Sequence, residues 1–381
     1  MFRNPFSDGE LARRVAAVRE AMAAGAIDTA VFSAPESVFY LTGLDHWGYF
    51  APHHLIVPQT GEMVLVTRAM ERVTIANQVR NARFSGHSDS VTAASHLARE
   101  LGPLAGARIG LEAQTSGLTF AAGRELAAAL GADRWADVSD LTAGLRQVKS
   151  AEEQMLMRAA ARASDAGTAA AIAAIGDGAP EAEVAAECTA AMIRAGSNPP
   201  GFGPFLRPGE RIAEEHTTWG DGRYRAGGRV MLELAGCVCR YHAPMGRLIH
   251  LGHIRDEDAA MAEIAKRAFD AALAGLRPGR RAREVYADWQ AVVDGAGMPQ
   301  YRRHHCGYLV GIGFPPSWTG GNTVTGLRHD SDLEVREGMC FHLLSWFTET
   351  GRGDFFVSNC ALLGPGGPEL LTQAPMGPTV V

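Results

Sequence analysis

Glu233 is the residue whose surroundings most strongly suggest chemistry. It stands in segment 230–234, Val-Met-Leu-Glu-Leu, which has the composition of a buried strand. A carboxylate is costly to bury unless a partner or a task holds it there. Glu233 is either a functional carboxylate or a strand-end side chain that points to solvent, and its apolar neighbours favour the first. After an expected tight bend at Ala235-Gly236, a second strand carries Arg240, Tyr241, His242 and Arg247.

Other side chains could assist a reaction at this carboxylate. His216 lies in the polar segment 215–219 and can carry a proton because imidazole titrates near neutral pH; it can also be a plain loop histidine. Tyr308 could stabilise a developing charge, and His342 could contact a substrate. Aromatic side chains on loops could bind a delocalised cation or simply pack at a domain boundary. These are Trp47, Tyr49, Trp219 and Trp318.

The predicted elements that position these residues fall into two groups. The first half alternates helices, expected near 8–24, 70–78, 92–101 and 117–130, with strands at 29–33, 39–41, 55–58, 63–67 and 107–112. This alternation predicts a small α/β domain with a mixed sheet. The second half predicts helices at 151–174, 180–195, 257–275 and 282–295, with strands at 229–235, 238–251, 308–314, 339–347 and 355–363. Loops 198–209 and 315–326 are expected at the mouth of the site.

A domain boundary is predicted near residue 148. Ser150 followed by Glu153 forms a capping box that opens a long helix. We therefore expect an N-terminal domain over residues 1–148 and a C-terminal catalytic domain over residues 149–381.

The segment 229–250 resembles the strand pair that holds the metal in the prolidase, aminopeptidase P and methionine aminopeptidase ("pita-bread") superfamily. The junction at 146–153 resembles the start of the catalytic domain of those enzymes. The resemblance implies an α/β (α+β) fold: a small creatinase-like N-terminal domain and a pita-bread domain with pseudo-two-fold symmetry. The five metal-ligand positions of the family fall here on Glu233, Pro244, Tyr308, Leu344 and Ser358. One carboxylate cannot make a two-metal site, so we expect no metal and no other cofactor.

Three further motifs resemble the ectoine hydrolase-like, metal-free branch of this superfamily. They are segments 40–50, 233–247 and 307–318, which includes Tyr-Leu-Val-Gly-Ile-Gly-Phe-Pro-Pro-Ser-Trp. The chain departs from that branch at Ser317 and Ser358, where the family has acidic residues. His216 falls on the position of the proton-handling histidine of creatinase, a metal-free relative. Gly246 and Leu344 replace acidic residues of creatinase, which argues against creatine as substrate.

The resemblance implies hydrolysis of a cyclic amidine such as ectoine or hydroxyectoine. Glu233 would attack the amidine carbon or activate water, with His216, His242 and Tyr308 as further catalytic candidates. Arg240 and Arg247 are candidates for binding a substrate carboxylate through forked hydrogen bonds. His242 can equally be a satisfied histidine between strands, and Arg247 falls where the metallopeptidases have a structural arginine. The full substrate-binding set is Tyr241, Arg240, Arg247, Trp47, Tyr49, Trp219, Trp318 and His342.

Composition limits the remaining function classes. The 381 residues carry a net charge of −6 and include 20% charged residues, which predicts no nucleic-acid partner. No apolar run reaches membrane-spanning length, and the N-terminus lacks a signal-like apolar segment, so a cytoplasmic protein is expected. Its six scattered cysteines are expected to be reduced thiols. Neither Cys237-x-Cys239 nor the adjacent His304 and His305 is interpreted as a metal site.

Three functions remain open at this stage. A metal-independent hydrolase of a small C–N substrate is favoured over a metal-dependent Xaa-Pro aminopeptidase or dipeptidase and over a non-catalytic binding module. In creatinase-like dimers the N-terminal domain covers the partner's active site, which implies a homodimer and a role for Trp47 and Tyr49. The expected partners are therefore a small-molecule substrate and a second copy of the chain.

Overall fold

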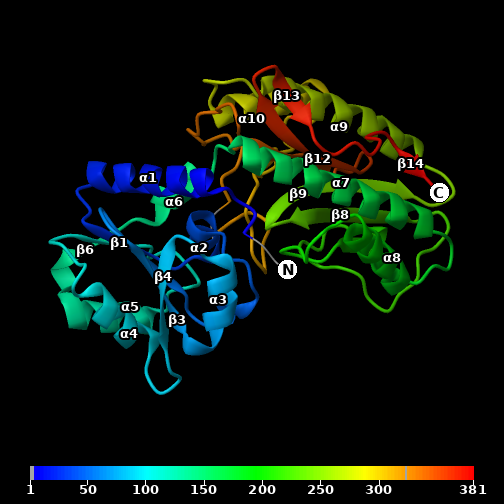
Figure 1. Cartoon of the computed structure of the whole chain (residues 1–381). Helices are drawn as coiled ribbons and strands as arrows, with labels where there is room; N and C mark the ends of the chain where they lie inside the picture. Colours follow the sequence, from blue (N-terminus) through cyan, green and yellow to red (C-terminus); the bar gives the residue numbers. More distant parts are fainter. Residues whose placement is uncertain (1–3, 322–323) are drawn as a thin grey trace. The chain divides into compact units, whose positions relative to one another are not determined.

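A computed structural model describes residues 4–321 and 324–381. The chain divides between Arg146 and Gln147 into two compact units, each with its own sheet. Within the described ranges, no helix has the length and apolar character needed to cross a membrane. The expected α/β architecture with two different sheets is confirmed (Figure 1).

The N-terminal unit is built on a six-stranded mixed sheet. Its strand order is β4-β3-β2-β1-β5-β6, in which β2 runs antiparallel to both neighbours and the other pairs are parallel. The strands are β1 Thr29–Phe32, β2 His54–Pro58, β3 Met63–Arg68, β4 Ala82–His87, β5 Ile109–Leu111 and β6 Trp135–Asp137; the helices are α1 Asp8–Ala24, α2 Pro35–Thr42, α3 Arg72–Gln78, α4 Ala93–Leu101, α5 Phe120–Leu130 and α6 Ser139–Leu145.

The strand predicted at 39–41 is wrong, because this segment lies inside helix α2. Pro35 occupies the first helical turn, and Gly43 ends the helix with a left-handed φ of 73°. The helix is buried over residues 36–42. A short apolar run that is buried on every side has no periodicity that separates helix from strand.

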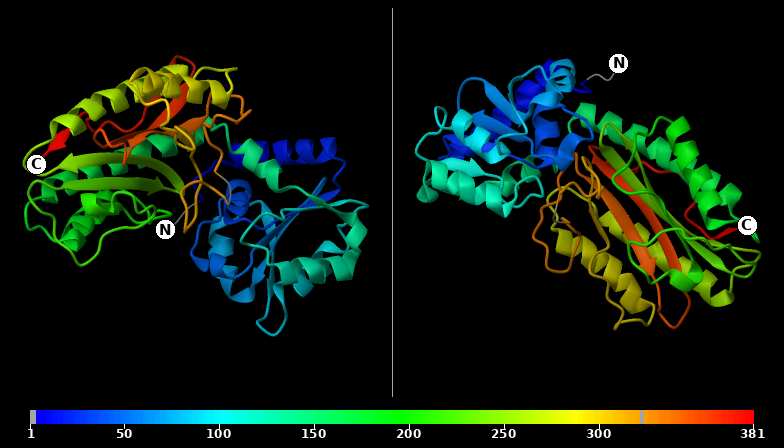
Figure 2. Two further views of the ribbon diagram at one scale, coloured as in Figure 1. Left: turned by 180° about the vertical axis from the view of Figure 1, so that it is seen from behind. Right: turned by 90° about the horizontal axis from the view of Figure 1, so that it is seen from below.

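The C-terminal unit repeats one motif twice around a single sheet. Each half has two helices and a long antiparallel hairpin, and the strand order β10-β11-β12-β9-β8-β7 places the hairpins side by side (Figure 2). This arrangement is the predicted pseudo-two-fold. The helices are α7 Ala151–Ala174, α8 Glu181–Arg194, α9 Asp256–Gly275 and α10 Ala282–Gly295; the strands are β7 Phe205–Pro208, β8 Arg229–Val238, β9 Tyr241–His250, β10 Gly307–Leu309, β11 Cys340–Phe347, β12 Phe355–Gly364, β13 Gly367–Leu370 and β14 Thr379–Val380.

Helices cover one face of this sheet. Helix α7 packs on β8 and β9, and α9 packs on β11 and β12. Leu232 and Leu234 join a buried cluster with Val184 and Cys188 of α8. Successive strand residues point to opposite faces, so Glu233 must project from the other face. The predicted capping box at Ser150 and Glu153 is present at the start of α7.

The bend expected at Ala235-Gly236 is wrong. Strand β8 continues to Val238, and the hairpin turns at Cys239 and Arg240, whose φ values are 47° and 66°. Positive φ at both central residues is the backbone of a tight two-residue hairpin turn. Gly236 serves another purpose, because a Cβ there would collide with the carbonyl oxygen of Ala160 in α7.

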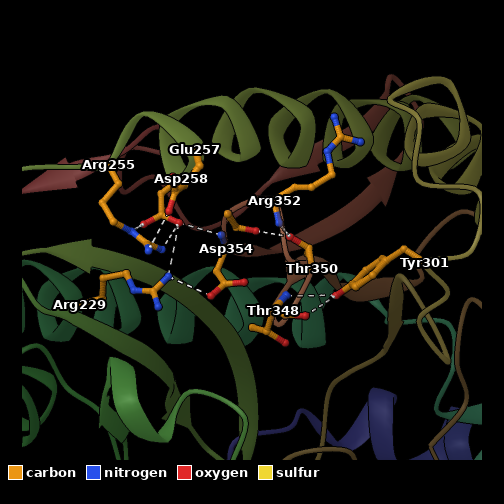
Figure 3. Close-up of polar contacts among 10 residues, drawn as sticks. Arg229, Arg255, Glu257, Asp258, Tyr301, Thr348, Thr350, Arg352 and Asp354 are labelled. Atoms are coloured by element: carbon orange, nitrogen blue, oxygen red, sulfur yellow. Dashed lines mark hydrogen bonds and ion pairs between the residues drawn. The ribbon is translucent and has the colours of Figure 1, made fainter.

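A buried carboxylate ties the two halves of the sheet together at the start of α9. Asp258 accepts hydrogen bonds from Arg255 Nε at 2.8 Å, the Asp354 backbone N–H at 2.8 Å and Arg229 Nη1 at 3.4 Å (Figure 3). Burial alone would raise the pKa of Asp258, but these hydrogen bonds outweigh burial and lower it. Asp258 therefore joins the first strand of one hairpin to the turn of the other.

Replacing Asp258 with Ala should lower the free energy of unfolding by about 2–4 kcal/mol, because a buried ion-pair network loses its shared acceptor. Chemical unfolding followed by circular dichroism measures the change. The neighbouring Glu257 is the matched control, since its exposed side chain pairs with the exposed Arg255. Glu257→Ala should change stability by no more than about 0.5 kcal/mol; equal effects of the two substitutions would contradict this assignment.

Candidate active site

A cavity of about 440 Å³ opens on the helix-free face of the C-terminal sheet. Its walls are mainly aromatic and imidazole side chains, with a few charged groups among them. The described lining residues are Phe202, Phe205, Arg207, Glu215, His216, Glu233, His304, His305, Tyr308, Ser317, Trp318, Thr319, Val324, Arg328, Leu344 and Trp346. Glu233 thus lies in a concave, largely apolar pocket, the usual setting of a small-molecule site.

Strand register brings the centre of this site together. Glu233 pairs with Phe205 on one side and Gly246 on the other; Gly246 pairs with Ser358, and Ser358 pairs with Leu344. Directly paired residues share a face of the sheet. Residues separated by more than 100 positions therefore form one row across four neighbouring strands and the edge strand β7.

The carboxyl group of Glu233 is buried without a hydrogen-bond donor from the described residues, and its pKa is raised. No described residue donates a hydrogen bond to it, and the nearest imidazole atom, His342 Nε2, lies 4.0 Å from Oε1. Burial raises the pKa of Glu233 from 4.5 to about 7, against the opposing effect of the Arg207 charge. A carboxyl group that titrates near neutrality can act as a base or a nucleophile and can also be reprotonated.

Tyr308 is held beside Glu233 by a chain of hydrogen bonds. Trp318 Nε1 donates to Tyr308 Oη at 3.0 Å, and the same oxygen lies 2.8 Å from His342 Nδ1. His342 Nε2 lies 2.7 Å from Ser358 Oγ. Burial raises the pKa of Tyr308 well above its ordinary value and lowers that of His342 well below its own, so both are neutral at ordinary pH. The Tyr308 proton then goes to His342 or to the cavity, depending on the tautomer of His342.

Two of the predicted residues face the other side of the sheet. Arg247 pairs with Leu232, and its guanidinium donates to the carbonyl oxygens of residues 246, 358, 374 and 375 and to Asn359 Oδ1. Tyr241 donates to Glu153 Oε1 at 2.8 Å. The structure does not bring either residue to the cavity, and both connect the hairpin to its surroundings.

His242, Arg240 and Trp219 are also absent from the described lining. His242 is completely satisfied: its Nδ1 lies 2.9 Å from the Arg240 carbonyl, and its Nε2 accepts from the Gly201 N–H at 2.9 Å. Burial lowers its pKa to about 4. The Arg240 guanidinium lies over the Phe314 ring, 4.6 Å from its centroid. Trp47 and Tyr49 belong to the N-terminal unit.

Several lining residues are not among those singled out from the sequence. Arg207 lies in the short strand β7. Like Glu233, it is a charged residue within an apolar segment, and this pattern could have identified it from the sequence. His304 and His305 are expected to point apart on a strand, but no strand covers them, and their ring centroids lie 4.1 Å apart. Both line the cavity, and burial lowers the pKa of His305 to about 3.

Family comparisons agree with this architecture. The metallopeptidase family M24 model matches residues 155–362, and the creatinase/prolidase N-terminal domain model matches residues 14–148. The chain belongs to metallopeptidase family M24. It is a hydrolase of the creatinase/prolidase superfamily, whose members act on carbon–nitrogen bonds.

Relatives of this M24 protein carry hydrolase, creatinase and dipeptidase names. The ectoine hydrolase of Halomonas elongata is 27% identical over 97% of each chain. The creatinase of Bacillus sp. strain B-0618 is 23% identical over 98% of this chain and 93% of its own. The structure of an Xaa-Pro dipeptidase from Bacillus anthracis superposes with a TM-score of 0.86 at 20% identity, covering 97% of this chain and 100% of the other.

The M24 family name implies a metal centre, and the residues at this site do not fit one. Of the five positions that the resemblance to the pita-bread enzymes assigns to metal ligands, four hold Pro244, Tyr308, Leu344 and Ser358. Tyr308 and Ser358 are joined through His342, and Leu344 presents only carbon. In residues 4–321 and 324–381, no three His, Cys, Asp or Glu side chains are grouped so that they could hold a metal ion.

The raised pKa of Glu233 predicts a pH-dependent stability difference between the native protein and Glu233→Gln. Because the folded-state pKa lies above the unfolded value, ionisation opposes folding, and native stability falls as pH rises from about 4.5 to 7. Glutamine does not ionise. Glu233→Gln should therefore match the native protein near pH 4 and exceed its free energy of unfolding by about 1–3 kcal/mol above pH 7.

Unfolding in denaturant across this pH range measures the difference in free energy of unfolding between the two proteins. A constant difference between the two proteins would show that Glu233 titrates normally.

Proposed function

We propose that this M24 protein hydrolyses a compact cyclic amidine, such as ectoine or hydroxyectoine, without a metal ion. The observation that carries the proposal is the isolated Glu233 carboxyl group, with its pKa near 7, in an aromatic cavity. The 27% identity to an ectoine hydrolase along nearly the whole chain supports the same substrate class.

The reaction adds water across the amidine carbon. Oxygen from water forms the new carbonyl, one ring C–N bond breaks, and the freed nitrogen leaves as an amine that has gained protons. Ionised Glu233 either takes a proton from the attacking water or attacks the carbon itself, forming an acyl intermediate that water then opens. Its negative charge also stabilises the bound amidinium, because electrostatic interactions are strong in a cavity that excludes water.

Neighbouring side chains supply the remaining roles. His216 lines the cavity near the Phe202 and Phe205 rings and would carry the proton to the leaving nitrogen. Tyr308, already accepting a hydrogen bond from Trp318, can direct its own proton towards the substrate when His342 donates to it. Trp318 and Phe205 offer ring surfaces to the delocalised cation.

Two other functions make different predictions. An Xaa-Pro dipeptidase, the name of one structural relative and of one relative found by sequence, would need added divalent metal and would cleave proline dipeptides. A binding module would retain ligand affinity but would not convert the ligand. Glu233 argues against a simple binding role, because an unpaired buried carboxyl group destabilises the fold.

Incubation of ectoine with chelator-treated protein should yield a product heavier by one water molecule in mass spectrometry. Glu233→Gln should lower kcat at least about 1,000-fold, because it removes the base or nucleophile. The value of kcat/KM should rise with pH through about 7, since only ionised Glu233 is active.

Glu257→Gln, which removes an exposed carboxylate outside the cavity lining, serves as the control and should retain activity within a few-fold. Cleavage of proline dipeptides that appears only with added manganese or zinc would favour the peptidase function instead. Binding of ectoine without turnover would favour the binding module, and no binding of any amidine would remove this substrate class.

We also propose that the functional unit is a homodimer whose N-terminal units contribute to substrate binding. Trp47 and Phe50 of the N-terminal unit are 60% and 83% exposed, which is uncommon for large aromatic side chains. Light scattering should give twice the chain mass. Trp47→Ala should raise KM more than it lowers kcat, whereas Phe120→Ala, another 83% exposed aromatic of this unit, should change neither. A fully active monomer would contradict the proposal.

A further inference from the structure

Arg207 is a buried cation without an oxygen partner. It is 1% exposed, lies on β7 and lines the cavity. Its Nε and Nη1 atoms have no hydrogen-bond partner among the described residues, and Nη2 contacts only the sulfur of Met231. A buried guanidinium normally requires acceptors for its five N–H groups. The described residues provide no oxygen acceptor for the guanidinium of Arg207.

Two other buried arginines of this protein show the usual solution. Arg247 donates to five oxygen atoms, and Arg14 donates to Glu10 and to the Tyr40 carbonyl. Both therefore have a structural reason to be buried. Arg207 differs in that its free N–H groups belong to a residue of the cavity wall.

The position of Arg207 relative to Glu233 is set by the β7–β8 register. Arg207 pairs with Met231 and Glu233 pairs with Phe205, so the two charged residues are diagonal neighbours on one face. Diagonal neighbours have Cα atoms about 7–8 Å apart. Among the described residues no ion pair joins them, although the Arg207 charge still lowers the pKa of Glu233. Arg207 and Glu233 therefore line one cavity as diagonal neighbours, and neither has a direct charged partner among the described residues.

We propose that Arg207 binds the carboxylate of the substrate, and that this cavity selects compact zwitterions with a carboxylate at Arg207 and a cationic C–N group at Glu233. The second half of this statement rests on the proposed function, whereas the first half rests on Arg207 alone. Arginine binds carboxylates with strong, directional hydrogen bonds, which are strongest in a site that excludes water. Arg328, the other cation of the described lining, is half-exposed and already donates to Asp330.

This assignment replaces the role expected for Arg240 and Arg247. Arg247 has its donors occupied on the opposite face, and Arg240 stacks on Phe314 away from the described lining. Arg207 is the buried arginine that the register places on the same face as Glu233.

Calorimetric binding tests the proposal with two ligands that differ only in the carboxylate. These are ectoine and 2-methyl-1,4,5,6-tetrahydropyrimidine, which has the same ring without it. Glu233→Gln is the background, so that the ligand is not consumed. In this background ectoine should bind more tightly than the ring without a carboxylate. Adding Arg207→Met should lower the affinity for ectoine about 100-fold, since a buried charged hydrogen-bonded pair is lost. The same substitution should change the affinity for the ring without a carboxylate by less than about threefold.

Two further variants control for structural damage. Arg207→Lys keeps the charge but loses the planar fork, so its affinity for ectoine should be intermediate. Arg328→Met removes the partnered cation of the same cavity and should leave the preference for ectoine intact. Arg207→Met should raise the melting temperature of the ligand-free protein, because it removes an unsatisfied buried charge; a structural role would lower it.

The outcomes separate this inference from the proposed function. Unchanged preference for ectoine in Arg207→Met would overturn the role of Arg207 and leave amidine hydrolysis standing. If neither ring binds, the amidine substrate is wrong, and the same variants are compared on proline and prolinamide. A preference for proline over prolinamide that disappears with Arg207→Met would then support Arg207 as the carboxylate-binding residue. If there is no such preference, or if it persists in Arg207→Met, that role is overturned.

Discussion

Backbone pairing of β8 with β7 and β9 decides which side chains can take part in chemistry. Glu233 opposite Gly246 places the carboxylate on the helix-free face, in line with Ser358 and Leu344. The same register sends Arg247 towards the opposite face, where backbone carbonyls satisfy it. A slip of one residue would exchange the two faces and bury the leucines of β8 in the cavity wall. The close approach of α7 at Gly236 fixes this hairpin against the helix layer.

Within the cavity, the protein leaves two opposite charges without direct partners. Glu233 and Arg207 are only 8% and 1% exposed, so burial among aromatic walls and strand backbone removes most of the solvent contact that would stabilise them. Folding tolerates that cost because the surrounding sheet and helices determine the geometry independently. A zwitterionic ligand would replace the missing solvation of both groups together. The electrostatic strain of the ligand-free state thus becomes binding energy and selectivity.

The chain has the M24 fold, but among the described residues no three His, Cys, Asp or Glu side chains are grouped so that they could hold a metal ion. His342 bridges Tyr308 and Ser358, so the polar groups of these two side chains are satisfied by hydrogen bonds within the protein. Leu344 adds apolar surface beside them. The buried cluster between the first helix pair and its hairpin contains none of these side chains and lies on the other face of the sheet. The site can therefore vary in chemistry while the fold stays constant.

Local patterns in the sequence determine most helices and strands, the capping box at Ser150 and the buried character of Glu233. Each of these depends on residues within one or two turns or on the apolar neighbours of a single strand. Local patterns also mislead where burial is uniform, as in α2, and where a turn needs no glycine, as at Cys239 and Arg240. The tertiary structure alone decides that Arg207 shares the cavity with Glu233 and that Arg247 does not. That distinction follows from the register between β7, β8 and β9, which is fixed by packing between distant segments and leaves no local mark in the sequence.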